Sequence, residues 1–197
     1  MLPGPSACWG VRLPGALLWA LMTVLPLAVG ASVGPRVAAA PRSEPPPQLA
    51  QLRLLVGEWR CEGERLALAS EPGRALRARL SVRAEMEGFW FASHYVEQVP
   101  KGGAGGLERH HWWGYRAQDR LLVTSFVGSG GDSGTASSPG WSGDELIFNG
   151  SMETGAGERL PWRYILTRHG NQAFDDRTEV NRQGEWIPML THASCRR

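Results

Sequence analysis

Residues 75–86 read Ala-Leu-Arg-Ala-Arg-Leu-Ser-Val-Arg-Ala-Glu-Met, and this stretch decides the fold class. From Leu76 to Met86 every second residue is apolar, and arginine, serine or glutamate fills the positions between. Successive side chains of a β-strand point to opposite faces of a sheet, so the alternation predicts a strand with one buried and one solvated face. Residues 57–65 alternate in the same way and place glutamates on their charged face. We expect these glutamates to pair with the arginines of 75–86 on the outside of the protein.

Seven further stretches have the character of strands, and turn-forming residues separate them: 88–98, 108–116, 120–128, 143–151, 160–168, 172–182 and 185–195. The long segment 129–143 is expected to be a loop. Apolar residues at three-to-four spacing in 48–56 predict a short helix before the first strand. The choice is between a sandwich and a barrel, and we favour the barrel because closure removes exposed edges. The sequence thus predicts an all-β domain over 48–197, a single antiparallel up-and-down barrel of about 8–10 strands with a short N-terminal helix.

The N-terminal segment has the layout of an export signal. No charged side chain occurs from Leu13 to Pro35, and the apolar centre of this run is about ten residues long. We interpret 1–31 as a signal peptide, with an uncleaved membrane anchor as the alternative. Residues 32–47 are rich in proline and alanine and are interpreted as a linker. The predicted location is outside the cytoplasm, either periplasmic or secreted, and membrane-anchored only if the segment stays uncleaved.

Cleavage would remove Cys8 and leave one pair of cysteines, Cys61 and Cys195. The first and last strands of a closed barrel are neighbours, and both cysteines share a face with the residues expected to point inward. We therefore predict a disulfide between them, as suits an exported protein. Two buried free thiols are the alternative.

Several motifs carry a resemblance to known families. Leu55-Val56-Gly57-Glu58-Trp59 after a short helix resembles the Gly-x-Trp opening of lipocalin-like (calycin) barrels, in which the tryptophan closes one end. Four later motifs extend the likeness: Glu87-Gly88-Phe89-Trp90, Trp113-Gly114-Tyr115, Trp141-Ser142-Gly143-Asp144-Glu145-Leu146 and Gly184-Glu185-Trp186. With them the chain resembles the DUF1579 family of uncharacterised bacterial proteins across nearly all of 49–197. The resemblance implies a calycin-type barrel and brings no established activity. Nitrobindin-type haem barrels are a more distant likeness.

Composition and charge exclude some classes of partner. The 21 basic and 19 acidic residues are interspersed and give a net charge of +2, so no nucleic-acid partner is expected. Gly131-Asp132-Ser133-Gly134 matches a protease motif by letter, but the chain lacks the larger double barrel that this chemistry needs, and Ser133 is expected in a mobile loop. Asp175 and Asp176 are adjacent on a strand and should diverge. We expect neither catalytic residues nor a cofactor, and an enzyme is the less favoured class.

Aromatic side chains are the strongest indication of a ligand. Barrels of eight to ten strands can hold one small molecule among such side chains. We predict that a small apolar or amphipathic ligand binds in the lumen among Trp90, Trp112, Tyr115, Phe126, Phe148 and Trp162. A solid-cored barrel with a structural or interaction role is the alternative.

Histidines provide a second hypothesis, a haem-dependent barrel that acts on small oxidants through His192 or His94. On the last strand His192 should point outward unless a bulge turns it. A metal site is not expected, because only one of His110 and His111 can share a face with His94 and no cysteine or carboxylate was found to complete a ligand set.

Overall fold

The computed structural model describes residues 44–66, 73–99 and 106–197. The chain divides into two units, 1–41 and 42–197, and every described element belongs to the second. The predicted signal peptide (1–31) and residues 32–43 of the predicted linker lie outside the described residues. Within the described ranges, no helix has the length and apolar character needed to cross a membrane.

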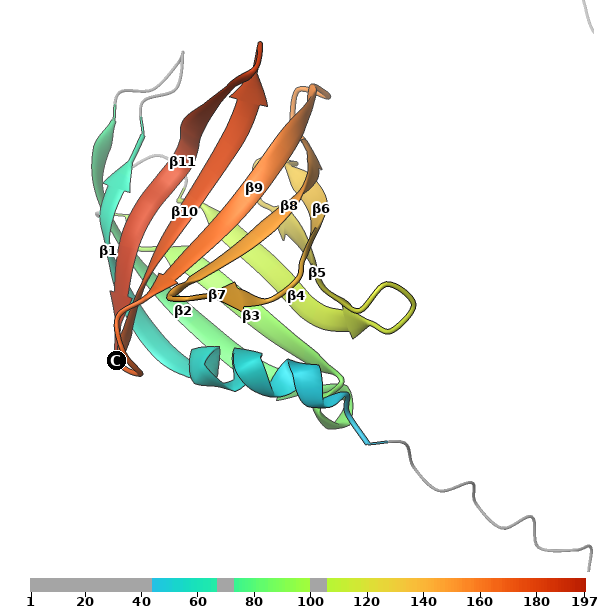
Figure 1. Cartoon of the computed structure of the whole chain (residues 1–197). Coiled ribbons are helices and arrows are strands. Elements are labelled where there is room, and N and C mark those ends of the chain that lie inside the picture. Colours follow the sequence, from blue (N-terminus) through green and yellow to red (C-terminus); the bar gives the residue numbers. More distant parts are fainter. Residues whose placement is uncertain (1–43, 67–72, 100–105) are drawn as a thin grey trace, which may run out of the picture. The chain divides into compact units, whose positions relative to one another are not determined.

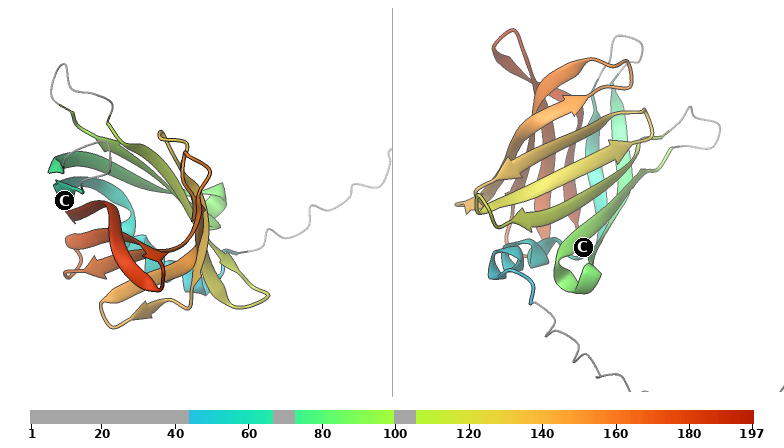
Figure 2. Two further views of the ribbon diagram at one scale, coloured as in Figure 1. Left: turned by 90° about the horizontal axis from the view of Figure 1, so that it is seen from above. Right: turned by 90° about the vertical axis from the view of Figure 1, so that its right-hand side faces the viewer.

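Ten antiparallel strands close into a barrel (Figures 1 and 2). Within the ring, β1 to β6 and β8 to β11 pair in chain order, β6 pairs with β8, and β1 pairs with β11 to complete the ring. The short β7 lies outside the ring and pairs only with β8. This confirms the predicted all-β, up-and-down barrel. The strands are β1 (Gly57–Arg65), β2 (Arg74–Glu85), β3 (Trp90–Glu97), β4 (Glu108–Arg116), β5 (Leu121–Gly128), β6 (Ser133–Ser138), β7 (Trp141–Ser142), β8 (Glu145–Glu153), β9 (Arg159–Arg168), β10 (Ala173–Arg182) and β11 (Glu185–Arg196).

The expectation that 129–143 is a loop was wrong, because this segment contains β6 and β7. Ser133, expected in a mobile loop, begins β6. The glycine, serine and alanine residues of β6 have weak strand propensity, but the close packing of the neighbouring strands requires small residues. A Cβ atom on Gly134 would lie 2.6 Å from the Phe126 ring, and one on Gly150 of β8 would lie 2.0 Å from the Thr135 carbonyl oxygen. The close approach of β5, β6 and β8 therefore explains the glycines.

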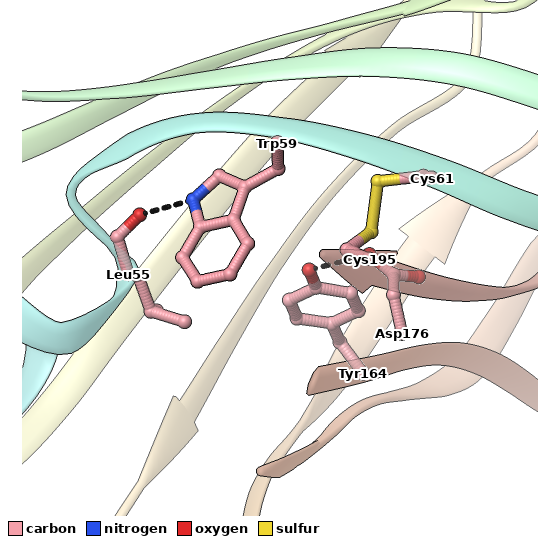
Figure 3. Close-up of a disulfide and its surroundings, with 6 residues drawn as sticks. All are labelled: Leu55, Trp59, Cys61, Tyr164, Asp176 and Cys195. Carbon is pink, nitrogen blue, oxygen red and sulfur yellow. Dashed lines mark hydrogen bonds between the residues drawn. A yellow bond between two sulfur atoms is a disulfide. The ribbon is translucent and has the colours of Figure 1, made fainter. Parts of the chain in front are cut away.

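A 3-10 helix, η1 (Pro47–Leu55), covers one end of the barrel (Figures 1 and 2) and confirms the short helix predicted there. Its three inward leucines, Leu49, Leu52 and Leu55, are buried. Trp59 is 2 % exposed, and its indole N–H donates to the Leu55 carbonyl at 2.8 Å (Figure 3). Gly57 joins the helix to β1 with φ +139°, a conformation that side chains with a Cβ rarely adopt. The Gly-x-Trp motif thus closes this end of the barrel.

The predicted disulfide is present. Cys61 of β1 lies directly opposite Cys195 of β11, the two Cα atoms are 4.0 Å apart, and the sulfur atoms are bonded across a separation of 134 residues (Figure 3). The bond joins the first and last strands where the ring closes. In the chain-entropy account of disulfides, so long a loop contributes up to about 5 kcal/mol of stability.

The charged faces of β1 and β2 lie together on the outside, as expected. Glu62 is opposite Arg77, and their side chains approach to 3.9 Å while both stay exposed. Exposed pairs of this kind contribute only about 0–1 kcal/mol, so this face is a solvated surface.

One further 3-10 element lies between two strands of the barrel. A three-residue 3-10 turn, η2 (Met86–Gly88), joins β2 to β3, and both Met86 and Glu87 have positive φ. This turn explains why β2 ends at Glu85, one residue before the predicted strand end at 86.

Candidate functional site

The interior of the barrel contains two different layers. Near η1 the inward side chains are apolar, and Trp59 packs edge-on against Phe174 with ring centroids 4.8 Å apart. Farther along the strands the inward positions carry polar side chains. Those that line a common space are Ser93 and Tyr95 of β3, Arg109 and His111 of β4, Tyr164 of β9, Asp176 of β10 and Thr191 of β11.

These side chains, with Leu80, enclose a cavity of about 20 Å³. A space of this size holds about one water molecule. We call it the interior cavity. The strands that surround it come from both halves of the chain, so it exists only because the barrel closes.

Three polar side chains that line the interior cavity are buried with a polar atom unpartnered. Tyr95, Arg109 and His111 are 8 %, 5 % and 5 % exposed. Among the described residues, the Tyr95 hydroxyl, the Arg109 Nε and the His111 Nδ1 have no hydrogen-bond partner. An unsatisfied buried polar group costs about 1–3 kcal/mol, so three around one cavity mark a place built to receive a polar group.

The electrostatics of the interior cavity combine one cation with groups held neutral. Burial, reinforced by the Arg109 charge and by His110, keeps the pKa of His111 well below its ordinary value, so this imidazole is uncharged at neutral pH. Arg109 Nη2 donates to the Asp132 carboxylate at 3.2 Å and leaves Nε free. Burial raises the pKa of Tyr95, and this hydroxyl stays protonated as a donor.

Opposite these groups, the Tyr164 hydroxyl donates to Asp176 Oδ2 at 2.8 Å (Figure 3). Asp176 is partly exposed as a whole residue, but its carboxyl group faces the interior cavity. Burial of that carboxyl raises its pKa, although the Tyr164 hydrogen bond and the Arg109 charge act in the other direction. Burial, followed by the nearby Asp176, likewise raises the pKa of Tyr164.

A second ion-pair cluster lies at the end of β1 and β2 farthest from η1. The Glu97 side chain is fully buried and is held by Arg65 at 3.1 Å and by Arg74 at 2.6 Å. The Leu107 backbone N–H donates to the same carboxylate at 2.9 Å. These contacts fix the position of the end of β3.

The six predicted ligand-binding residues do not surround one space. Phe126, Phe148 and Trp162 point inward and are buried, and the Phe126 and Trp162 rings lie 4.8 Å apart. Trp90 and Trp112 occupy outward positions, because they alternate with the buried Phe91 and Trp113. Tyr115 is partly buried near the end of β4. Three of the six residues predicted to bind a ligand in the lumen are therefore buried inward side chains.

Trp90 and Tyr115 instead line a groove of about 690 Å³ on the barrel wall. Small polar side chains of β5, β6 and β8 form a large part of its remaining surface: Ser125, Thr135, Ser137, Asn149 and Ser151. The Trp90 ring covers Gly114, where a Cβ atom would lie 2.7 Å from it. Sequence reasoning missed this groove because β6 had been assigned to a loop.

The two histidines of the haem hypothesis both lie on the outer face. His192 is exposed, as the alternation along the last strand predicted, and it lies opposite Arg177 of β10. His94 is partly exposed and pairs with His110. Neither lines the interior cavity, where the imidazole is that of His111. Asp175 and Asp176 diverge as expected, with Asp175 outside against His169 and Asp176 inside against Tyr164.

One premise of the sequence reasoning was wrong, namely that no carboxylate joins the strand histidines. Glu108 lies two residues before His110 and therefore on the same face of β4, beside His94. The nearest ligand atoms of His94, Glu108 and His110 all lie within 4.8 Å of one another. The i, i+2 spacing of Glu108 and His110 was the available signal.

The geometry defines a class of protein: a closed ten-stranded β-barrel, sealed at one end by a helix, with a polar cavity inside. Residues 44–196 match the family described as "Protein of unknown function (DUF1579)", and the chain belongs to this family. No curated protein matches the sequence. Among solved structures, that of Rv2717c from M. tuberculosis is similar, with a TM-score of 0.56 at 11% identity over 78% of this chain and 99% of that one. This likeness concerns the fold.

Proposed function

We propose that the protein is an exported calycin-type binding barrel that takes up a small amphipathic molecule with a carboxylate at its polar end. One observation carries the proposal: Tyr95, Arg109 and His111 each present an unpartnered buried polar atom to the same cavity. Ligand sites in proteins are typically apolar chambers with a few such convergent polar groups.

The charges favour an acidic head group. The free Arg109 Nε–H and the Tyr95 O–H are donors, and a carboxylate accepts from both. His111 is neutral and adds no charge of its own. The raised pKa of Asp176 reduces the negative charge facing the ligand as pH falls toward that pKa. Phe126, over which the Arg109 guanidinium lies at 4.9 Å, and Trp162 would contact the apolar part.

Binding requires inward side chains to move, because the interior cavity holds only about one water molecule. Ile187 and Met189 precede Thr191 on the inward face of β11 and are only partly buried. They also lie beside the register shift between β10 and β11. Moving them costs less packing than moving a fully buried side chain, and we place the entry route of the ligand beside them.

Export is supported by the disulfide, because such bonds persist in oxidising compartments. Mass spectrometry of the protein from its own host tests it. A mature chain that begins near residue 32 is the expected result, and an intact residue 1 in a cytoplasmic fraction would contradict it.

A fluorescent dansylated fatty acid tests the ligand class, with the free acid and its methyl ester as competitors. Charged hydrogen bonds of about 1.5–3 kcal/mol predict that the acid competes roughly 10- to 100-fold better. The double variant Arg109→Gln/Asp132→Asn removes the cation without leaving its partner unpaired, and it should abolish this preference. Tyr95→Phe should reduce it, and the exposed Arg83→Gln is the matched control. Equal competition by acid and ester in the wild type would exclude the proposal.

A further inference from the structure

We propose that His94, His110 and Glu108 form a binding site for a first-row divalent metal ion, best suited to Zn²⁺, on the outer wall of the barrel. This outer site is separate from the interior cavity, because its three residues occupy the outward positions of β3 and β4.

Strand pairing fixes the three ligands next to one another. His94 lies directly opposite His110, and their rings stack with centroids 4.4 Å apart and planes 8° from parallel. Glu108 is on the same face of β4, two residues away. Both strands belong to a closed barrel, so the backbone positions of the three ligands are fixed before the metal binds, and only their side chains have to be ordered.

The distances suit an ion bound by two imidazoles and one carboxylate. Glu108 Oε1 lies 2.7 Å from His94 Nε2 and 3.8 Å from His110 Nε2. Zn²⁺ bonds of about 2.0–2.2 Å in a tetrahedron separate neighbouring ligand atoms by roughly 3.3 Å, which lies between these two values. Small rotations of exposed side chains reach that arrangement. Three protein ligands leave a fourth position for water.

The surroundings leave the carboxylate available and the ion free to enter. The side chains of His94, His110 and Glu108 are 39%, 44% and 52% exposed. The residues paired with them on the adjoining strands are Ser81, Val127 and Val96, none of which is charged. The backbone of Glu108 is held in place, because its N–H donates to Ser129 Oγ at 3.0 Å and its carbonyl accepts from the Ser129 N–H at 2.8 Å.

Titration calorimetry with Zn²⁺ tests the outer site on the exported protein without a polyhistidine tag. One ion per chain is expected, with a loss of affinity of about tenfold or more in each of His94→Gln, His110→Gln and Glu108→Gln. The matched control is His169→Gln, since His169 also contacts a carboxylate, Asp175 at 2.8 Å, but among the described residues it does not belong to a group of three possible ligands. At about 100 times the dissociation constant, Zn²⁺ should raise the melting temperature of the wild type by roughly 5–10 °C.

Electron paramagnetic resonance of the Cu²⁺-loaded protein gives a second readout. Coupling to two imidazole nitrogens is expected, reduced to one in His94→Gln. Fluorescence of Trp112, whose ring lies 6.0 Å from that of His110, should be quenched, and Trp112→Phe identifies its share. The substituted residues are exposed, so circular dichroism should show an unchanged fold. Absence of stoichiometric Zn²⁺ binding in the wild type, or binding that persists in the double variant His94→Gln/His110→Gln, would overturn the proposal.

Discussion

The inner and outer faces of the β3–β4 pair carry two sites that are assembled in different ways. The interior cavity takes Tyr95, Arg109 and His111 from this pair but needs Tyr164 and Asp176 from β9 and β10 across the barrel. The outer site takes all of its residues from β3 and β4. The inner site is therefore a property of the closed ring, and the outer one is a property of a single pair of strands.

His110 and His111 show the contrast within two successive residues. His111 is buried among Tyr164, Phe126 and Trp113, and its burial favours the neutral form. His110 is exposed and stacks on His94. A one-residue step along a strand moves a side chain from low-dielectric surroundings into water, so identical residues acquire different chemistry.

The largest effect should come from breaking the buried ion pair of the inner face. Arg109→Met leaves Asp132 buried without its partner and should lower the free energy of unfolding by about 3–5 kcal/mol. Urea denaturation measures this. The double variant Arg109→Met/Asp132→Leu removes both charges and should recover most of the loss. A single-variant loss below about 1 kcal/mol would show that the pair is solvated.

Opening the ring should separate the two faces. Cys61→Ala/Cys195→Ala removes the bond at the closure of β1 and β11 and should cost about 2–5 kcal/mol. At temperatures where the variant stays folded, the outer site should keep its Zn²⁺ affinity, because none of its three residues lies on β1 or β11. The acid preference at the interior cavity should weaken first as temperature rises. Parallel loss of both properties would contradict a local outer site.

The inner carboxyl should make stability depend on pH. Because the folded state raises the pKa of Asp176 above its ordinary 3.8, it binds this proton more tightly than the unfolded chain does. This contribution to stability is fully present below pH 3.8 and is lost as pH rises through the folded pKa. Asp176→Asn keeps an acceptor for Tyr164 and should be more stable than wild type at neutral pH, with the difference vanishing in acid. Thermal unfolding across pH checks this, and a difference that grows in acid would reverse the sign.

The smallest effect on stability should come from a substitution in the outer site when no metal is bound. His110→Gln changes an exposed side chain and should alter the free energy of unfolding by no more than about 0.5 kcal/mol in the presence of a chelator. Denaturation of the chelated and Zn²⁺-loaded forms measures both contributions. A large loss in the chelated form would mean that the stacked histidines support the fold itself.

The sequence by itself determined the strands with clear alternation, the closing helix, the Gly-x-Trp junction and the disulfide. These follow from local spacing, from the two faces of a strand and from the neighbourhood of the first and last strands in a closed ring. It also predicted that His192 points outward unless a bulge turns it, and the structure confirms the outward position. The aromatic set was the weaker inference, since Trp90 and Trp112 were grouped with inward residues although alternation places them outside.

Only the tertiary structure decided which side chains meet. Alternation assigns a residue to a face but does not fix which residue stands opposite it, and one step of register changes every partner. The pairings of His94 with Glu108 and of Tyr164 with Asp176 depend on that register. Strand β6 was hidden for a related reason: its glycine, serine and alanine residues show no apolar alternation, and they form a strand because β5 and β8 pair with it on either side. The close approach of these strands explains the glycine at 134.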